Sequence, residues 1–279
     1  MELTKNARSA RRHCSPAAHG FSLIEMMIVI LVISIIMGAV MKSINITQQA
    51  SASQQVKLDL TQQAREFVDQ LTRDLRSAGF PNVRNMNKAA VDLNVNGNCG
   101  DGTTNSLYSP CDPSNGVGVI KIDNGTLWFA GDVDGTSGAN GTAQVKIIRY
   151  DYVAAGANQP GCPCLRRTEY LRTAYQDPLT DASTTATTEQ LEIQGIQNNV
   201  NGGDPIFTAY NSTTGNVVAL PVDFDNNAST LAVINSIKVV LAVQSQYMDV
   251  VTKTFPVTRV TATISLGNCS EAAAGALGC

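Results

Sequence analysis

The alternation of apolar and polar residues divides the chain into a short polar leader, a long helix and a β-rich remainder. The leader ends at Gly20, and a mainly apolar run follows from Phe21 to Met41. Beyond this run, apolar residues return every three or four positions, which is the spacing of one face of an α-helix. That face consists of Val56, Leu60, Ala64, Phe67, Leu71, Leu75 and Ala78. Because neither Gly nor Pro interrupts Ala39 to Ala78, one long helix is expected over residues 21–80.

The end of this helix is marked by Gly79, Phe80 and Pro81. Gly79 can adopt the left-handed conformation that closes many helices, Phe80 can pack back on the helix, and Pro81 cannot continue it. The first part of the helix, residues 21–41, is long enough to cross a bilayer. The second part presents an apolar face that requires a globular partner.

Strand patterns dominate the remaining residues, 81–279, which we expect to form a globular head. The turn Asp123-Asn124-Gly125 separates two apolar stretches, which is a strong hairpin signal. Strands are expected at 117–122, 126–130, 144–153, 165–172, 206–210, 217–220, 237–243 and 260–266. Loops are expected at 82–116, 177–190, 197–204 and 223–230, and the tail at 267–279. The sequence therefore predicts an α+β fold, with the long helix covering one face of a mainly antiparallel sheet.

The apolar run contains one ionisable side chain, Glu25. A carboxylate inside a hydrocarbon segment is costly, so it indicates a function. The order of the signals also differs from that of an ordinary secretory signal, in which the small-residue cleavage site follows the apolar run. Cleavage after Gly20 would remove residues 1–20 and leave the apolar run as the new N-terminus. The alternative interpretation is a plain membrane anchor with an interfacial glutamate.

The stretch Gly20-Phe21-Ser22-Leu23-Ile24-Glu25, preceded by a basic leader, resembles the class III signal of type IV prepilins and type II secretion pseudopilins. The resemblance implies cleavage between Gly20 and Phe21 by a prepilin peptidase, followed by N-methylation of Phe21. It also implies that Glu25 pairs with the N-terminal amine of a neighbouring pilin subunit, and that the fold is pilin-like. The protein would sit in the inner membrane with its head in the periplasm, and then in the pilus.

Two further stretches resemble PilW-type minor pilins and J-type minor pseudopilins. One is the helix end from Asp69 to Phe80. The other is the order of Leu127-Trp128-Phe129-Ala130, Arg149-Tyr150 and Leu165-Arg166-Arg167.

Charge and histidine content exclude several classes of function. The leader holds four of the 20 basic and one of the 23 acidic residues, so a chain cut after Gly20 has a formal charge of −6. A basic leader stays in the cytoplasm, and an acidic mature chain matches nucleic acid poorly. Both histidines, His13 and His19, lie in the leader, which excludes Ser-His-Asp and HExxH chemistry in the mature chain. No carboxylate pair stands out, so we expect neither catalytic residues nor a cofactor.

Six cysteines lie outside the leader, and an even number beyond an inner membrane indicates disulfides. They are Cys99, Cys111, Cys162, Cys164, Cys269 and Cys279. Pairing between nearest neighbours is the simplest arrangement, although six cysteines allow fifteen connectivities. The Cys162-Pro163-Cys164 pair is the weakest case, since in a strand its Cα atoms would sit near the upper limit for a bridge. Pairing elsewhere, or a redox or metal role, stays open for these two residues.

Two weaker patterns are compatible with ligand binding. Asp132 and Asp134 match the start of a calcium loop, but the acidic residue expected at its far end is missing. Arginine and tyrosine alternate as in single-strand binders at Arg149, Tyr150, Tyr152, Arg166, Arg167, Tyr170 and Arg172. A plain turn and a solvated sheet face are the interpretations we favour, and no nucleic-acid partner is expected.

These observations give a ranked set of functions. The first is a minor pilin, a structural subunit near the tip or in the initiation complex of a type IV pilus, with roles in assembly, adhesion or motility. The second is a type II secretion minor pseudopilin. The third is a membrane-anchored binding module whose head contacts a ligand or DNA, and an enzyme comes last.

Overall fold

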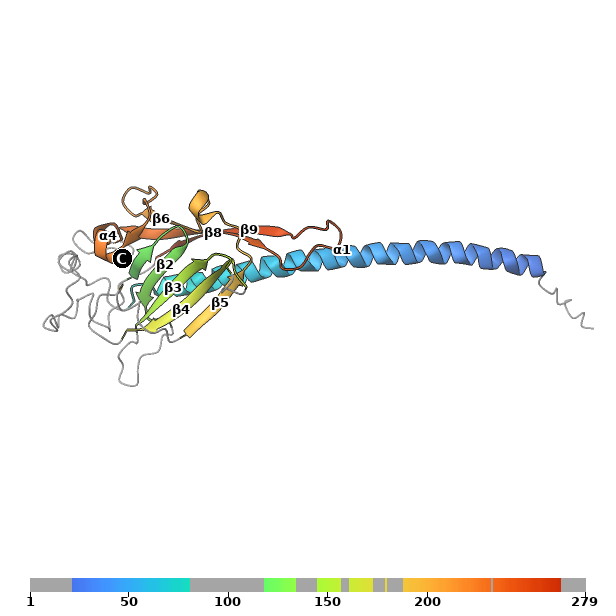
Figure 1. Ribbon diagram of the computed structural model, residues 1–279, viewed down its shortest axis with the longest axis horizontal. Coiled ribbons are helices and arrows are strands. Elements are labelled where there is room, and N and C mark those ends of the chain that lie inside the picture. The colour runs from blue at the N-terminus through green and yellow to red at the C-terminus, as the bar shows by residue number, and fades with distance from the viewer. Residues whose placement is uncertain are drawn as a thin grey trace, which may run out of the picture. The chain divides into compact units, whose positions relative to one another are not determined.

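The structure is a computed structural model that describes residues 22–80, 118–133, 145–156, 161–172, 179, 188–231 and 233–266. The chain forms two compact units, Met1–Ser51 and Ala52–Cys279. A long helix, α1 (Leu23–Ser77), supplies the described part of the first unit and continues into the second, which otherwise contains two antiparallel sheets (Figure 1). The α+β class expected from the sequence is confirmed.

The apolar stripe on the C-terminal part of α1 is buried as its spacing predicts. Leu60, Ala64, Phe67, Leu71 and Leu75 all lie in one hydrophobic core together with residues of both sheets. The helix ends at Gly79, which has the expected left-handed conformation with φ of 79°. The expectation that Phe80 packs back on the helix is wrong, because its side chain is 52% exposed.

Among the described residues, six strands form the larger sheet in the order β5-β4-β3-β2-β1-β7. Their bounds are β1 (Gly118–Ile122), β2 (Thr126–Gly131), β3 (Lys146–Val153), β4 (Cys164–Leu171), β5 (Thr188–Gln194) and β7 (Val222–Asp223). The hairpin predicted at Asp123-Asn124-Gly125 joins β1 to β2. Gly131, at the end of β2, touches the end of α1, where a Cβ atom would collide with the Ser77 carbonyl.

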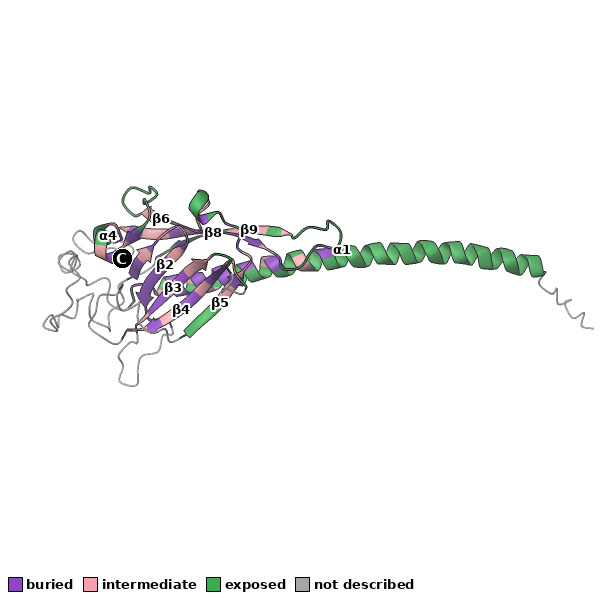
Figure 2. Ribbon diagram, in the orientation of Figure 1, coloured by how far each residue is buried: buried purple, intermediate pink, exposed green. Residues whose placement is uncertain are grey.

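The smaller sheet has the order β6-β8-β9. Its strands are β6 (Phe207–Asn211), β8 (Ile234–Gln244) and β9 (Val257–Ser265). The alternation predicted in β8 is confirmed, since Ile237, Val239, Leu241 and Val243 are all fully buried (Figure 2). The two sheets share one core, and the segment after β5 connects them through an Ile196–Val243 bridge.

Three expectations about secondary structure were wrong. Strand β5 begins inside the expected loop 177–190. Its first residues are polar and exposed, so they show no strand pattern in the sequence, and they are held in the sheet by pairing with β4. Residues 217–220 make only an isolated Tyr210–Val217 bridge. The expected loop 223–230 contains a short helix, α4 (Phe224–Leu231), at whose start Asp223 accepts a hydrogen bond from the Asn226 N–H. The loop expected at 197–204 is a loop in the structure, with a single 3-10 turn, η3 (Val200–Gly202), inside it.

A buried carboxylate, Asp74, joins α1 to the larger sheet. One of its oxygens, Oδ2, accepts hydrogen bonds from the Tyr150 hydroxyl at 2.6 Å and from Arg167 Nε at 2.7 Å. The other oxygen, Oδ1, accepts a hydrogen bond from the Gln70 amide at 2.9 Å. Asp74 and Arg167 are almost fully buried, so each charge is compensated by its partners rather than by water.

The protonation states of this group follow from burial and from the Asp74 charge. Burial lowers the pKa of Arg167, but the Asp74 carboxylate, Tyr150 and the hydrogen bond to Glu169 together outweigh this and hold the pKa above its ordinary value. Burial, followed by the same carboxylate, raises the pKa of Tyr150 well above its ordinary value. The tyrosine therefore remains a hydrogen-bond donor. Phe67 packs edge-on against the Tyr150 ring, with 5.8 Å between the ring centroids, and so holds the donor in place.

A second carboxylate, Asp249, joins the loop between β8 and β9 to α1. Its Oδ2 accepts a hydrogen bond from the Ser53 hydroxyl at 2.8 Å and lies 3.3 Å from Lys57 Nζ. Its Oδ1 accepts the backbone N–H groups of Val251 at 2.8 Å and Thr252 at 3.3 Å. These bonds, that from Val251 foremost, hold the pKa of Asp249 well below its usual range.

Asp74→Ala should destabilise the head by about 3 kcal/mol, because it leaves Arg167 buried with a reduced set of partners. Arg167 also pairs with Glu169, which keeps the loss near the lower end of the range for broken buried ion pairs. Denaturant unfolding followed by circular dichroism measures the difference. Asp69→Ala, at an exposed position of the same helix, is the matched control and should change stability little. Equal effects of the two variants would contradict the role given to Asp74.

Asp249→Asn should lower the melting temperature at neutral pH, and the difference from wild type should shrink in acid. A folded-state pKa below the unfolded value means that the unfolded chain binds more protons as the pH falls. The stabilisation by Asp249 is therefore present above about pH 4 and is lost below it. Melting curves across this range test the idea, with exposed Asp59→Asn as control. A difference that does not depend on pH would refute it.

Candidate functional site

The start of α1 holds Glu25, the residue predicted to serve assembly. Ser22 precedes the helix, and its carbonyl accepts the N–H groups of Glu25 at 3.0 Å and Met26 at 3.2 Å. Glu25 lies in the first helical turn, where a negative charge is favoured by the helix dipole. Gly20 and Phe21 lie outside the described residues.

The N-terminal part of α1 exposes its whole apolar surface. Every side chain from residue 22 to residue 51 is exposed, including those of Leu23, Ile30, Ile36 and Met41 (Figure 2). Among the described residues, α1 is the one helix long and apolar enough to cross a membrane. An apolar surface of this size is unfavourable in water and requires lipid or other helices to cover it. Between residues 22 and 41, Glu25 is the one ionisable side chain.

Cys162 and Cys164 are joined by a disulfide, with their Cα atoms 4.3 Å apart. This is the nearest-neighbour pairing that the sequence favoured least, and the turn at Pro163 brings the two residues close enough for it. A bridge leaves neither thiol available for a metal in this state. Cys99, Cys111, Cys269 and Cys279 lie outside the described residues, so their pairing stays a prediction.

The calcium-loop pattern cannot be assembled from the described residues. Asp132 is buried at the end of β2, and its N–H donates to the Phe80 carbonyl at 2.9 Å. Asp134 lies outside the described residues. Within the part of the chain that is described, His, Cys, Asp and Glu side chains do not form a group of three that could hold a metal ion.

The alternating arginines and tyrosines of β3 and β4 support the fold instead of forming a solvated face. Tyr150 and Arg167 bind Asp74 in the interior. On the other side of the sheet, the Arg149 guanidinium lies 3.8 Å from the centre of the Trp128 ring, and its Nη1 donates to the Tyr170 hydroxyl at 3.0 Å. Asp151 accepts hydrogen bonds from both Trp128 and Arg149. Rings occupied in this way are not free to stack on bases.

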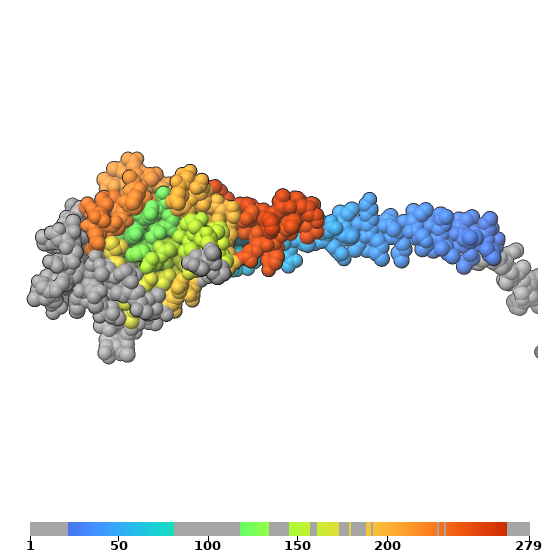
Figure 3. Space-filling view, in the orientation of Figure 1, coloured from blue at the N-terminus to red at the C-terminus, as the bar shows by residue number. Residues whose placement is uncertain are grey.

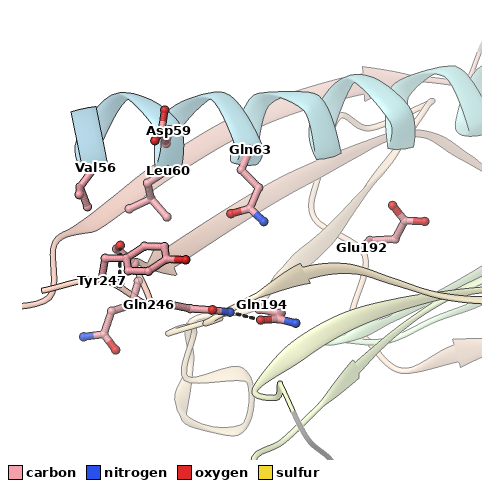
Figure 4. A pocket seen from close by; sticks show the side chains of 10 residues that line it. Val56, Asp59, Leu60, Gln63, Glu192, Gln194, Gln246 and Tyr247 are labelled. Carbon is pink, nitrogen blue, oxygen red and sulfur yellow. Dashed lines mark hydrogen bonds between the residues drawn. The ribbon is translucent and has the colours of Figure 1, made fainter. Parts of the chain in front are cut away.

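A cleft of about 460 Å³, which no sequence pattern predicted, lies between α1, the end of β5 and the end of β8. Val56 and Leu60 face the ring of Tyr247 across it, and Gln63, Gln194 and Gln246 surround them (Figure 4). The Gln246 amide donates to the Gln194 carbonyl.

The charge of the cleft lining limits what it can bind. Asp59 and Glu192 are its charged residues, and burial raises the pKa of Glu192. The lining includes no histidine, cysteine, lysine or arginine. The cleft can therefore receive a neutral polar group, but it holds no nucleophile with an adjacent base and no cation for a phosphate.

Comparison with known proteins agrees with the N-terminal assignment. Residues 16–41 match the family model described as the prokaryotic N-terminal methylation motif. Neither the curated proteins nor the solved structures include a match to the chain. The matched segment covers the end of the leader, the junction Gly20-Phe21, Glu25 and the apolar run, and proteins with this motif are structural subunits. The chain thus carries the N-terminal methylation motif of type IV prepilins, on a helix that can cross a membrane and continues into an α+β head.

Proposed function

We propose that this protein is a minor pilin, a structural subunit that enters a type IV pilus near its tip or in its initiation complex. The observation that carries the proposal is the position of Glu25 in the motif-bearing apolar run, residues 21–41, which is otherwise without charge. A prepilin peptidase would cut between Gly20 and Phe21 and methylate Phe21. The protein would wait in the inner membrane with its head in the periplasm.

Assembly would then replace lipid by the helices of other subunits. The apolar surface of residues 23–41 suits both lipid and a bundle of neighbouring helices, because lipid tails and apolar helix surfaces are about equally apolar. Glu25 distinguishes them, because a buried carboxylate requires a positive partner and the amine of a neighbouring Phe21 would provide one. The structure of the head suits a display or initiation role, since its elements are tied together by Asp74 and Asp249 independently of the N-terminal unit.

A type II secretion pseudopilin would share the same N-terminus and fold. Labelling the head on intact cells separates the two functions, since a pilin is found on extended surface fibres. Loss of the gene should then impair fibre formation and leave protein export intact. The opposite result would assign the protein to secretion.

Gly20→Leu should leave an uncut precursor in the membrane, because a bulky residue at the cleavage position blocks the peptidase. Immunoblots of the membrane fraction would show a band larger than wild type by the 20-residue leader. Gly38→Leu is the matched control, since Gly38 lies in the same apolar helix and a Cβ there meets open space. A precursor that is still shortened in Gly20→Leu would contradict the assigned cleavage site.

Glu25→Ala should be inserted and processed like wild type, and its head should fold, but few subunits should be recovered in sheared fibres. Glu66→Ala, an exposed glutamate of α1 beyond the apolar run, should be incorporated normally. Quantitative immunoblots of the membrane and fibre fractions give the ratio of assembled to membrane-bound protein for each variant. Wild-type incorporation of Glu25→Ala would contradict an assembly role, unless labelling places the subunit at the fibre end, where no subunit lies above it.

A further inference from the structure

The loop between β8 and β9 gathers apolar side chains that the core does not use. Six of the eleven residues from 247 to 257 are large, apolar and exposed: Tyr247, Met248, Val250, Val251, Phe255 and Val257. Elsewhere in the described part of residues 52–266, only Leu58, Phe80 and Val217 are of this kind. We call residues 247–257 the apolar hairpin end. A concentration of this kind marks an interaction surface.

The apolar hairpin end is held together by hydrogen bonds within the loop. The Ser245 N–H donates to the Pro256 carbonyl at 2.9 Å and closes the base of the loop. Inside it, the Asp249 N–H donates to the Thr254 carbonyl and the Lys253 N–H to the Asp249 carbonyl, both at 2.8 Å. With the two N–H groups bound by the Asp249 side chain, many of the loop's backbone polar groups have partners within the loop. Groups paired in this way do not oppose contact with an apolar medium.

The loop is attached to α1 at a point near the membrane-spanning segment in the sequence. Asp249 binds Ser53 and Lys57, and Figure 3 shows the hairpin, in red, beside this part of the head. Ser53 follows Met41, the last residue of the apolar run, by twelve residues. These residues belong to α1, in which twelve residues span about 18 Å. The anchor of the loop is therefore about three helical turns beyond the end of the apolar run.

The composition of the loop suits a lipid surface. Tyrosine is enriched at the interface between hydrocarbon and water, because its ring is apolar and its hydroxyl is polar. Lys253, at the turn of the loop, is exposed and can reach anionic headgroups. The one acidic residue between 247 and 257, Asp249, is buried and bound to Lys57, so it does not repel such a surface.

We propose that the apolar hairpin end inserts into the lipid interface of the membrane that anchors α1, and so gives the unassembled protein a second membrane contact. The inference rests on the membrane-anchored stage of the proposed function. Entry into a fibre would withdraw the loop from lipid together with α1.

Photo-crosslinking tests the proposal directly. The full-length protein is reconstituted into vesicles of phosphatidylethanolamine and phosphatidylglycerol, with p-benzoylphenylalanine replacing either Phe255 or Val217. Val217 is the matched control, because its side chain is 60% exposed but lies in a different loop. Mass spectrometry should find several-fold more lipid adduct at position 255 than at position 217. Equal yields, or adducts of position 255 with a second copy of the protein alone, would overturn the proposal.

A second variant tests whether the apolar side chains are responsible. Val251→Ser combined with Val250→Ser should lower the lipid adduct formed at position 255 several-fold, whereas Val217→Ser should leave it unchanged. The substituted side chains are exposed, so folding is preserved. Unchanged adduct in the double variant would count against the proposal. A protein that is processed after Gly20 and enters fibres but gives no lipid adduct would refute this inference alone, and the proposed function would stand.

Discussion

The head depends on one buried ion pair, between Asp74 of α1 and Arg167 of β4. The apolar stripe of α1 explains why the helix packs against the sheet, but apolar contacts are non-directional and do not by themselves define which polar groups must meet. Asp74 fixes the register, because its carboxylate must meet both the Tyr150 hydroxyl and Arg167 Nε at hydrogen-bonding distance. Since a displaced helix would leave buried charges without partners, the arrangement that satisfies them is strongly preferred. Asp249, in the loop between β8 and β9, links the smaller sheet to the start of the packed part of the helix through Ser53 and Lys57.

The elements that the sequence predicted correctly are those in which local pattern and burial coincide. The stripe from Leu60 to Leu75, the cap at Gly79 and the alternation in β8 could all be read from spacing. The start of strand β5 was missed because its first three residues are polar and exposed, and because its pairing with β4 is a long-range contact. Asp74 was missed for a similar reason. A polar residue in a helix gives no local sign of burial, and its partners lie 76 and 93 positions away.

The two units of the chain require different environments. Residues 22–51 have no buried side chain, so their stability requires lipid or neighbouring helices, and the methylation motif matches this segment. Residues from Ala52 onward have their own core and their own ion pairs. Under the proposed function, the protein would exchange a membrane for a fibre without refolding its head. The apolar hairpin end would take part in this exchange, because it is joined to α1 through Ser53 and Lys57.

In the proposed function, the N-terminal segment makes this protein a subunit of a fibre. Mass spectrometry of the protein recovered from sheared surface fibres tests this, since it identifies the N-terminus of the assembled form. We expect an N-terminal peptide that begins with monomethylated Phe21. Recovery of the chain from the membrane fraction alone, with an N-terminus at Met1, would contradict it.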